Sequence, residues 1–525
     1  MGNEISKSIN QVPPTFPLFG LRFHQQIGAF STLHANDDVQ TVVRHVIKKR
    51  FPGCTEQQPH ATCHAYKLPP KNYDKTTFWD GAAPFLAYAE LLQSLSKIGF
   101  FLMSSPDLFL TLEDPEMIFY LDRNQAAIFR VFCIRQRGQN QLQIFGGDDE
   151  ARELVEHAVK AITKLVDCKL TADMTTLMLD GKPWKELQQQ ATAGFVENPE
   201  LKTVSMRILV DIVQQLAASG YFTVGNACLD GDQDALFFAK REKLLATPNY
   251  AMISLIGSSS MVCLRFPQDI QQLIKDSVSR DWEKGLQNQL NLSKDAIELR
   301  LHGDPWLASA NKQQMSAPRR LLLALIRVLH ESGWSIECAI DVSNAVDDKS
   351  AFIFRSTVPS GASLQLMALQ PGGMNRLCAT NAPPDVVETL AKVLTTVLGR
   401  QAVTKQETTQ DGTVAFTLAG APWFPGDSDD ALMARHAVIV ALASLQTRGW
   451  RILCSADIQG DIRNMTEQRH VSTTTTKSGA SGQTSVGVFA VGGNGGRSKV
   501  KQQKVYKVTE TREQFDVSTM ILIKD

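Results

Sequence analysis

The N-terminus of this chain carries its clearest chemical signal. Residues 1–6 read Met-Gly-Asn-Glu-Ile-Ser, which fits the pattern for N-myristoylation, in which the initiator Met is removed and the amine of Gly2 is acylated. Pro13, Pro14 and Pro17 follow without apolar periodicity, so residues 1–20 are expected to form a flexible lead that a transferase can reach. The predicted lipidation site is therefore Gly2.

A single myristoyl chain holds a protein at a membrane only weakly, and stable binding needs a second signal. The first fifty residues contain no Cys, which excludes a neighbouring palmitoyl group. One local basic cluster is a candidate for contact with anionic lipid; it consists of Arg497, Lys499, Lys501, Lys504 and Lys507. Lysines also protect exposed edge strands against aggregation, and this second interpretation of the cluster is preferred.

Two segments contain residue types that bind metal ions. His60–His64 contains two His and one Cys, with Cys54 nearby, but their spacing matches no four-ligand zinc pattern. Asp230–Asp234 has the alternating carboxylates of a calcium-binding loop. Ala235 and Arg241 stand where that loop requires Gly at its sixth position and Glu at its twelfth, so the segment is predicted to be a turn between strands. No metal site is predicted.

The remaining motifs give no catalytic site. Gly492–Lys499 is rich in glycine, but the Gly-Lys-Ser/Thr order of a phosphate loop and the helix that should follow it are missing. The sequence has no Gly-x-Ser-x-Gly elbow, His-Glu-x-x-His helix or dinucleotide-binding fingerprint. Its ten His residues are scattered. We therefore predict no catalytic residue and no cofactor.

A short sequence motif recurs along the chain at intervals of about one small domain. It indicates repeated structural elements, which would have to position any functional site. Each copy has Leu, Gly and Pro before a Trp, and an apolar helix pattern follows that ends on Gly and an aromatic residue. The copies are Leu179–Trp184, Leu301–Trp306 and Leu418–Trp423, followed by Gly220-Tyr221, Gly333-Trp334 and Gly449-Trp450, with a divergent earlier pair at Gly99-Phe100. Because the Trp recurs beside Gly and Pro, it is predicted to pack in each domain core rather than to bind a ligand.

Residues 296–400 provide the template for one module. They predict a strand over 296–301, a helix whose buried stripe includes Leu322, Leu325, Ile326 and Leu329, and a left-handed Gly333 that ends it. Strands over 334–342, 351–357, 363–369 and 376–380 follow, and then a second helix after Pro383. Cys338 and Cys454 share one strand position and are expected to be small buried hydrophobes. The sequence predicts an α+β protein of tandem small modules, each with a mainly antiparallel sheet and two helices.

The repeat also sets the expected module bounds. We expect a partial module of one strand and one helix over 21–52, then a divergent module 1 over 53–168, module 2 over 169–280, module 3 over 281–400 and a divergent module 4 over 401–525. Within module 4, residues 471–498 are rich in Gly, Ser and Thr and predict an inserted loop. A period this long indicates that each module has its own core.

Composition restricts the classes of function. A chain of 525 residues needs several hydrophobic cores, and its 43% hydrophobic and 21% charged residues are typical of a globular protein. Lys plus Arg and Asp plus Glu number 54 each, so the net charge does not favour nucleic acid. No apolar run is long enough to span a membrane, and the N-terminus has no signal-peptide pattern. Nine Cys without a CxxC pair argue against a disulfide framework.

These observations predict a cytoplasmic, peripheral membrane protein. It would be a myristoylated, non-enzymatic scaffold or adaptor, whose partners are the cytoplasmic face of a membrane and other proteins. Two alternatives stay open: an enzyme with its site in one divergent module or in a cleft between modules, and a structural subunit of a larger assembly. An enzyme should gather polar residues that break the repeat pattern, whereas a binding array should show equivalent exposed patches on successive modules.

Overall fold

The computed structural model describes residues 17–25, 27–74, 77–106, 108, 116–184, 199–229, 234–241, 247–306, 316–342, 349–359, 364–373, 375–423, 429–458 and 518–524. Within them, one order of elements occurs four times: strand, strand, helix, strand, strand, helix, strand, strand. Each occurrence builds a six-stranded antiparallel sheet. The predicted class, an α+β protein of tandem modules with antiparallel sheets, is therefore confirmed.

The first half of the chain contains modules 1 and 2. Module 1 consists of β1 (Leu18–His24), β2 (Ala29–Leu33), α2 (Asp37–Arg50), β3 (Thr55–His60), β4 (Cys63–Lys67), α3 (Ala83–Ser96), β5 (Phe100–Ser104) and β6 (Glu116–Leu121). Module 2 consists of β7 (Phe129–Arg137), β8 (Gln141–Phe145), α4 (Asp149–Ile162), β9 (Leu165–Leu170), β10 (Met174–Leu179), α6 (Val204–Ala218), β11 (Tyr221–Cys228) and β12 (Asp234–Lys240). Short 3-10 helices η1 (Pro70–Asn72) and η2 (Phe78–Asp80) precede α3, and η3 (Pro199–Thr203) precedes α6.

The second half repeats this order in modules 3 and 4. Module 3 consists of β13 (Tyr250–Ile256), β14 (Ser260–Leu264), α7 (Gln268–Asp281), β15 (Leu286–Ser293), β16 (Ala296–Leu301), α8 (Ala317–Glu331), β17 (Trp334–Ile340) and β18 (Ala351–Ser356). Module 4 consists of β19 (Gln365–Gly372), β20 (Arg376–Thr380), α9 (Pro384–Val397), β21 (Val403–Thr408), β22 (Val414–Leu418), α10 (Asp429–Gln446), β23 (Arg451–Ala456) and β24 (Thr519–Lys524).

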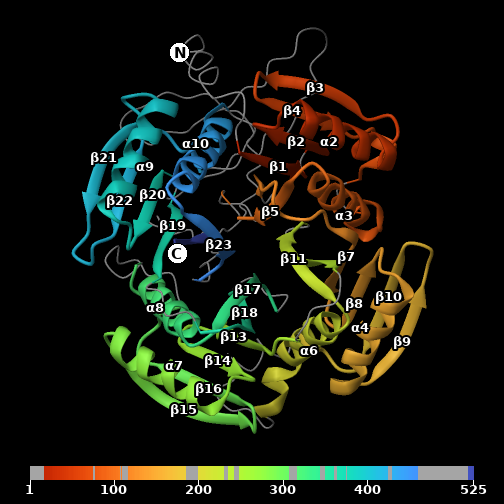
Figure 1. Ribbon diagram of the computed structural model, residues 1–525, viewed down its shortest axis with the longest axis vertical. Helices are drawn as coiled ribbons and strands as arrows, with labels where there is room; N and C mark the ends of the chain where they lie inside the picture. The colour runs from red at the N-terminus through yellow and green to blue at the C-terminus, as the bar shows by residue number, and fades with distance from the viewer. Residues whose placement is uncertain are drawn as a thin grey trace, which may run out of the picture.

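All four sheets have the same topology. The strand order in module 1 is β3-β4-β2-β1-β6-β5, and the other three sheets repeat it. One edge of each sheet is the third strand of its module, and the other edge is the fifth. We call β3, β9, β15 and β21 the outer strands and β5, β11, β17 and β23 the inner strands, because the former lie on the rim of a ring and the latter around its middle (Figure 1).

The second helix of each module lies between its own sheet and the sheet of the next module. Phe85 on α3 stacks on Phe145 of module 2, with ring centroids 4.3 Å apart. In the same way α6 contacts β13, α8 contacts β19 and α10 contacts β1. Leu18, Leu33 and Ile118 of module 1 join the apolar cluster around α10. Module 4 therefore packs on module 1, and the four modules close into a ring (Figure 1); we call α3, α6, α8 and α10 the bridging helices.

The glycine after each bridging helix has the predicted conformation. The φ angles are 84° at Gly99, 85° at Gly220, 82° at Gly333 and 84° at Gly449. A residue at this position in the left-handed region lets the last helical carbonyls find partners, and glycine adopts it without a steric cost. The Gly-aromatic pair is therefore a helix stop in all four modules.

The recurring Trp residues are core residues, as expected. Trp184, Trp306 and Trp423 are all 0% exposed. The indole nitrogen of Trp184 donates to the carbonyl oxygen of Gln141 at 2.8 Å, and that of Trp423 donates to Arg376 at 2.6 Å. Gln141 and Arg376 each begin the second strand of their module, so the two Trp residues have equivalent environments. Cys338 and Cys454 are buried as well.

The sheets divide the chain at points other than the expected module bounds. They begin at Leu18, Phe129, Tyr250 and Gln365, so bounds at 52, 168, 280 and 400 fall inside modules, near the end of each first helix. Residues 21–52 belong to module 1 and are no separate partial module. A recurring signal gives the period of an array but not the point at which one sheet is complete, which depends on strand pairing. Residues 471–498 and most of the 1–20 lead lie outside the described residues.

Candidate functional site

The residues predicted to contact a membrane lie outside the described part of the chain. Gly2 precedes residue 17, where the description begins. The basic cluster falls within residues 459–517, and its members are Arg497, Lys499, Lys501, Lys504 and Lys507. Both sites stay predictions. Among the described residues, no helix is long and apolar enough to cross a membrane.

The His60–His64 segment spans the end of β3, a two-residue turn and the start of β4. Cys63 is 4% exposed and lies in the apolar cluster around α10. His64 follows it in the same strand and points to the opposite face, where its Nδ1 lies 3.7 Å from Glu56 Oε1. The possible ligands therefore do not converge. In the described residues, no group of three or more His, Cys, Asp or Glu could hold a metal ion.

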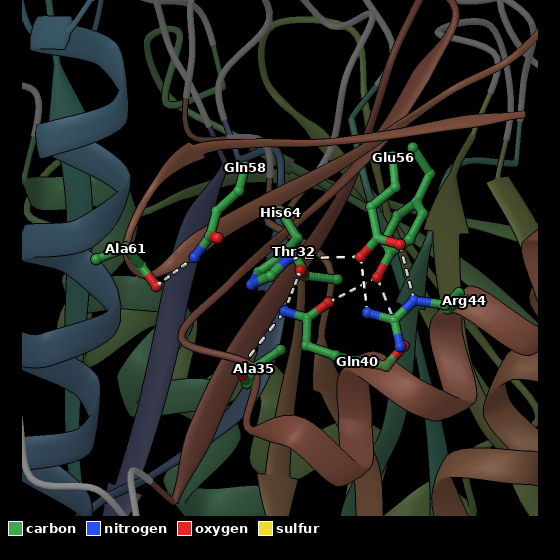
Figure 2. A network of polar contacts seen from close by, with 9 residues as sticks. Thr32, Ala35, Gln40, Arg44, Glu56, Gln58, Ala61 and His64 are labelled. Carbon is green, nitrogen blue, oxygen red and sulfur yellow. Dashed lines mark hydrogen bonds and ion pairs between the residues drawn. The ribbon is translucent and has the colours of Figure 1, made fainter.

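A polar network connects α2 to the outer part of its own sheet (Figure 2). Arg44 donates two hydrogen bonds to Glu56, from Nε to Oε2 at 2.8 Å and from Nη2 to Oε1 at 2.7 Å, and these bonds lower the pKa of Glu56. The Tyr66 hydroxyl donates to Gln40 Oε1 at 2.8 Å. Gln40 Nε2 donates to Thr32 Oγ1 at 2.8 Å. These groups satisfy one another, so the network fixes α2 on β3 and β4.

A second polar network lies under α10, where module 4 meets module 1. Arg435 donates from Nε and Nη2 to the two carboxylate oxygens of Glu116, at 2.5 and 3.0 Å. The two side chains are 3% and 0% exposed. Arg435 Nη2 also lies 3.4 Å from Ser31 Oγ, which is 2.7 Å from His24 Nε2. This buried ion pair joins residues that are far apart in the sequence.

Two histidines lie at the same junction. His34 Nε2 and His436 Nδ1 are hydrogen-bonded, and the rings are stacked with centroids 4.5 Å apart. Burial, followed by the charges of His436 and Arg435, lowers the pKa of His34 to about 3, and burial lowers the pKa of His436 to about 4. Both rings are therefore neutral at neutral pH. We call the set Glu116, Arg435, Ser31, His24, His34 and His436 the closing centre.

Polar contacts recur at the other junctions. Arg319 on α8 corresponds in position to Arg435 and donates to Thr519 Oγ1 of module 4 at 3.1 Å. Between modules 2 and 3, Lys202 and Glu298 form a buried ion pair at 3.0 Å. Between modules 1 and 2, Arg135 Nη2 donates to the carbonyl oxygen of Trp79 at 2.7 Å, and its guanidinium lies 4.4 Å from the centroid of the Phe85 ring. Recurrence at every junction indicates that the closing centre serves ring assembly.

Sequence reasoning missed these junction residues, although one signal was present. Arg319 and Arg435 stand at the same distance before Gly333 and Gly449, within apolar helix patterns. A charged residue at the same buried helical position in two repeats predicts a buried partner. The identity of that partner was not available from local sequence, because Thr519 and Glu116 belong to neighbouring modules.

Hydrogen bonds also join neighbouring modules around the middle of the ring. They involve residues at the ends of the inner strands and in the segments that follow them. The bonds are Ser104 Oγ to Ser455 Oγ at 2.9 Å, Ser105 Oγ to the Asn226 carbonyl at 2.5 Å, the Asp341 amide to Asp234 Oδ2 at 2.9 Å, and the Ser350 amide to the Asp457 carbonyl at 2.9 Å. Asp234, the described end of the calcium-like segment, thus accepts a backbone amide of the next module.

The outer strands form four equivalent exposed edges. Five of six residues are exposed in β3 and in β9, five of eight in β15 and four of six in β21. Among the described residues each outer strand pairs on one side only. The four edges are spaced around the rim of the ring (Figure 1). Unpaired backbone groups along such an edge can bind another extended chain.

Comparison with known proteins supports the repeat and its bounds. One family model matches the chain twice, over residues 249–355 and 365–474. The first match coincides with the sheet of module 3, and the second begins with the sheet of module 4. The model describes a domain with no indicated function, and together its two matches cover less than half of the chain. No curated protein and no solved structure matches the chain.

Proposed function

We propose that this protein is a non-enzymatic scaffold or adaptor that binds proteins along its rim and is held reversibly at the cytoplasmic face of a membrane by a myristoyl group on Gly2. The observation that carries the proposal is the set of four equivalent exposed outer strands. Equivalent patches on successive modules are what a binding array requires, because each module then offers the same kind of contact to a partner.

Strand addition is the mode of binding that this rim supports best. An added strand receives its affinity from main-chain hydrogen bonds, and the side chains of the edge provide specificity. The side chains differ among the four outer strands: β3 reads Thr-Glu-Gln-Gln-Pro-His, whereas β21 reads Val-Thr-Lys-Gln-Glu-Thr. The four outer strands therefore offer the same kind of edge with different side chains, and in β3 Pro59 has no backbone N–H to donate to an added strand.

Cross-linking tests this part of the proposal. Partners captured from cells are cross-linked through amines to the bound protein, and the linked residues are identified by mass spectrometry. We expect links to Lys169 on β9 and Lys405 on β21, whose side chains are 71% and 64% exposed. Lys160 on α4, which is 55% exposed, is the control away from an edge. Links that avoid both outer-strand lysines in every captured partner contradict rim binding.

The membrane part of the proposal rests on the sequence of residues 1–6 and on the weak anchoring that one acyl chain provides. Mass spectrometry of the native N-terminus should find an acylated Gly2. The protein should divide between membrane and soluble fractions, and Gly2→Ala should move it to the soluble fraction. Neutralising Lys499, Lys501 and Lys504 should move it further only if the basic cluster contacts anionic lipid. An unacylated Gly2 or a retained Met1 contradicts the anchor.

A second candidate function is an enzyme with its site between modules. The observation that favours it is the contact of His24 Nε2 with Ser31 Oγ at 2.7 Å, beside Arg435 and Glu116, because a base within hydrogen-bond distance can activate a hydroxyl. Ser31 is only 3% exposed, which favours a structural role. Labelling by a fluorophosphonate that is lost in Ser31→Ala and His24→Gln would support the enzyme; an unlabelled Ser31 would exclude a serine nucleophile there.

A further inference from the structure

The outer strand of module 2 differs from the other three in its exposed apolar side chains. Val166 and Leu170 on β9 are 61% and 64% exposed. On β15, Leu290 is the one large apolar side chain that is exposed, at 36%. β3 and β21 have no large exposed apolar residue among those described. Large aliphatic side chains on an unpaired edge strand favour association with another chain.

The sequence of β9 is complementary to itself when two copies run antiparallel. With Cys168 opposite Cys168 of the partner subunit, Asp167 of each copy faces Lys169 of the other. Val166 then faces Leu170 in the same way. Opposite charges and paired aliphatic side chains both stabilise directly opposed positions of an antiparallel ladder. The symmetry is that of a two-fold dimer, in which both copies use the same surface.

We propose that a second copy of this chain binds along β9, so that the module 2 sheets of the two copies join into one continuous antiparallel sheet. The charges favour a second copy of this chain as the bound strand, because an unrelated strand would have to supply both a Lys opposite Asp167 and an Asp or Glu opposite Lys169. The apolar pair of Val166 and Leu170 favours the edge of module 2 over the edges of the other modules. β21 also has opposite charges two residues apart, Lys405 and Glu407 around Gln406, in the reverse order to Asp167 and Lys169, but Thr404 and Thr408 stand at the flanking positions.

The free edge is partly protected in the single chain. Asp167 Oδ1 accepts the backbone amide of Cys168 at 2.9 Å, and Asp167 Oδ2 lies 3.9 Å from Lys169 Nζ. On dimerisation the Cys168 amide would bond to the other copy, and the Asp167 carboxylate would turn to Lys169 of the partner subunit. The Cys168 amide and the Asp167 carboxylate thus have a partner in both states, which favours a reversible dimer over aggregation.

The test measures self-association of the full chain by sedimentation velocity over a range of concentrations. The wild type should be a concentration-dependent dimer. Val166→Lys combined with Leu170→Lys should weaken the dimer at least about tenfold, because it removes the apolar pairs and adds like charges. Thr404→Lys on β21 is the matched control and should leave the dimer unchanged. A wild type that is monomeric at all concentrations, or a dimer that the β9 variant leaves intact, overturns the proposal.

Charge reversal separates the proposed register from any loss of folding. Asp167→Lys alone places like charges opposite one another and should weaken the dimer, whereas Asp167→Lys with Lys169→Asp restores opposite charges and should return its affinity to near that of the wild type. A short bismaleimide should link wild-type dimers through Cys168, which is exposed, and should not link Cys168→Ser. Failure of the double variant to recover, or links that persist in Cys168→Ser, contradicts this register.

The dimer goes beyond the proposed scaffold and does not depend on it, because the measurements use unacylated protein. Where a second copy occupies β9, the outer strands β3, β15 and β21 are left for other partners. One consequence does rest on the proposed function: a dimer carries two Gly2 residues. Two acyl chains on one particle provide the second membrane signal that a single myristoyl chain lacks.

Discussion

The junction that closes the ring and the junction between modules 3 and 4 use the same helix position in different ways. Arg435 on α10 and Arg319 on α8 are both buried, at 3% and 0% exposed, and each reaches the first residue of the last strand in the following module. That residue is Glu116 at the closing junction and Thr519 at the other. One arginine thus forms a two-bond ion pair, and the other donates to a hydroxyl.

The difference follows from how the two junctions are held. Modules 3 and 4 are consecutive in the chain, so their contact has a high effective concentration, although the Lys202–Glu298 pair between modules 2 and 3 shows that consecutive modules can share a buried ion pair as well. Modules 4 and 1 are joined through the whole ring, and their contact must select module 1 of the same chain. A buried charge that is satisfied only by the correct partner disfavours every other contact, because misplacement leaves it unpaired. The closing centre therefore contributes specificity as well as stability.

The largest expected effect is the loss of one member of the ion pair. Glu116→Gln leaves the Arg435 guanidinium buried without a carboxylate and should destabilise the protein by about 3–5 kcal/mol. Thr519→Val removes a neutral acceptor at the equivalent position and should cost about 1–3 kcal/mol. Urea unfolding gives both values, and amide exchange should locate the first loss in α10 and β1. Equal costs for the two variants would show that the junctions do not differ in this way.

The two histidines make the closing junction sensitive to acid. Above about pH 6.5 both His34 and His436 are neutral in folded and unfolded chains, so their contribution to stability is complete. As pH falls from there toward about 4, the unfolded chain binds protons that the folded chain does not, since burial lowers the folded pKa values to about 3 and about 4, and stability is lost. Urea midpoints should fall over this range. His436 corresponds in position to Leu86 on α3, so leucine is tolerated at this helix position. His436→Leu should therefore reduce the dependence of the urea midpoint on pH. An unchanged dependence would contradict the role of His436 in acid sensitivity.

The glycines that end α8 and α10 provide a second comparison of the two junctions. Gly333 and Gly449 have nearly the same φ, 82° and 84°. A Cβ at Gly333 would lie 2.7 Å from the Thr357 carbonyl oxygen, whereas the nearest atom at Gly449 is Lys524 Cε at 3.7 Å. Both alanine variants pay the left-handed strain of about 1–2 kcal/mol, and Gly333→Ala should cost about 1–3 kcal/mol more. Thermal melts of the pair decide this; similar losses would mean that the backbone near Thr357 gives way.

The sequence predicted local structure better than it predicted contacts between modules. The strand over 296–301 coincides with β16, and the strands expected over 334–342, 351–357, 363–369 and 376–380 overlap β17 to β20. Side-chain period and turn residues are local, so these elements could be found. The module bounds could not, because the sheet of module 4 is completed by β24 at residues 519–524, after a long interval in the sequence. The Arg435–Glu116 pair was out of reach for the same reason.

The smallest expected effect concerns the space that the ion pair requires. Gly20 on β1 pairs with the third residue of β6, and Ala368 on β19 pairs with the third residue of β24, so the two positions are equivalent in modules 1 and 4. A Cβ at Gly20 would lie 2.0 Å from Glu116 Oε1 and 2.8 Å from Ile439 Cδ1 on α10. Glycine is therefore needed at the closing junction, whereas alanine fits where Arg319 meets Thr519.

Gly20→Ala should displace the Glu116 carboxylate from Arg435 and destabilise the protein by about 1–3 kcal/mol. Ala368→Gly should cost only about 0.5–1 kcal/mol, from the greater freedom of glycine in the unfolded chain. Combined with Glu116→Gln, the Gly20 substitution should cost less than it does alone, because the carboxylate it disturbs is no longer bonded as an ion pair. A double-mutant cycle in urea measures this coupling, and full additivity of the two costs would separate Gly20 from the closing centre.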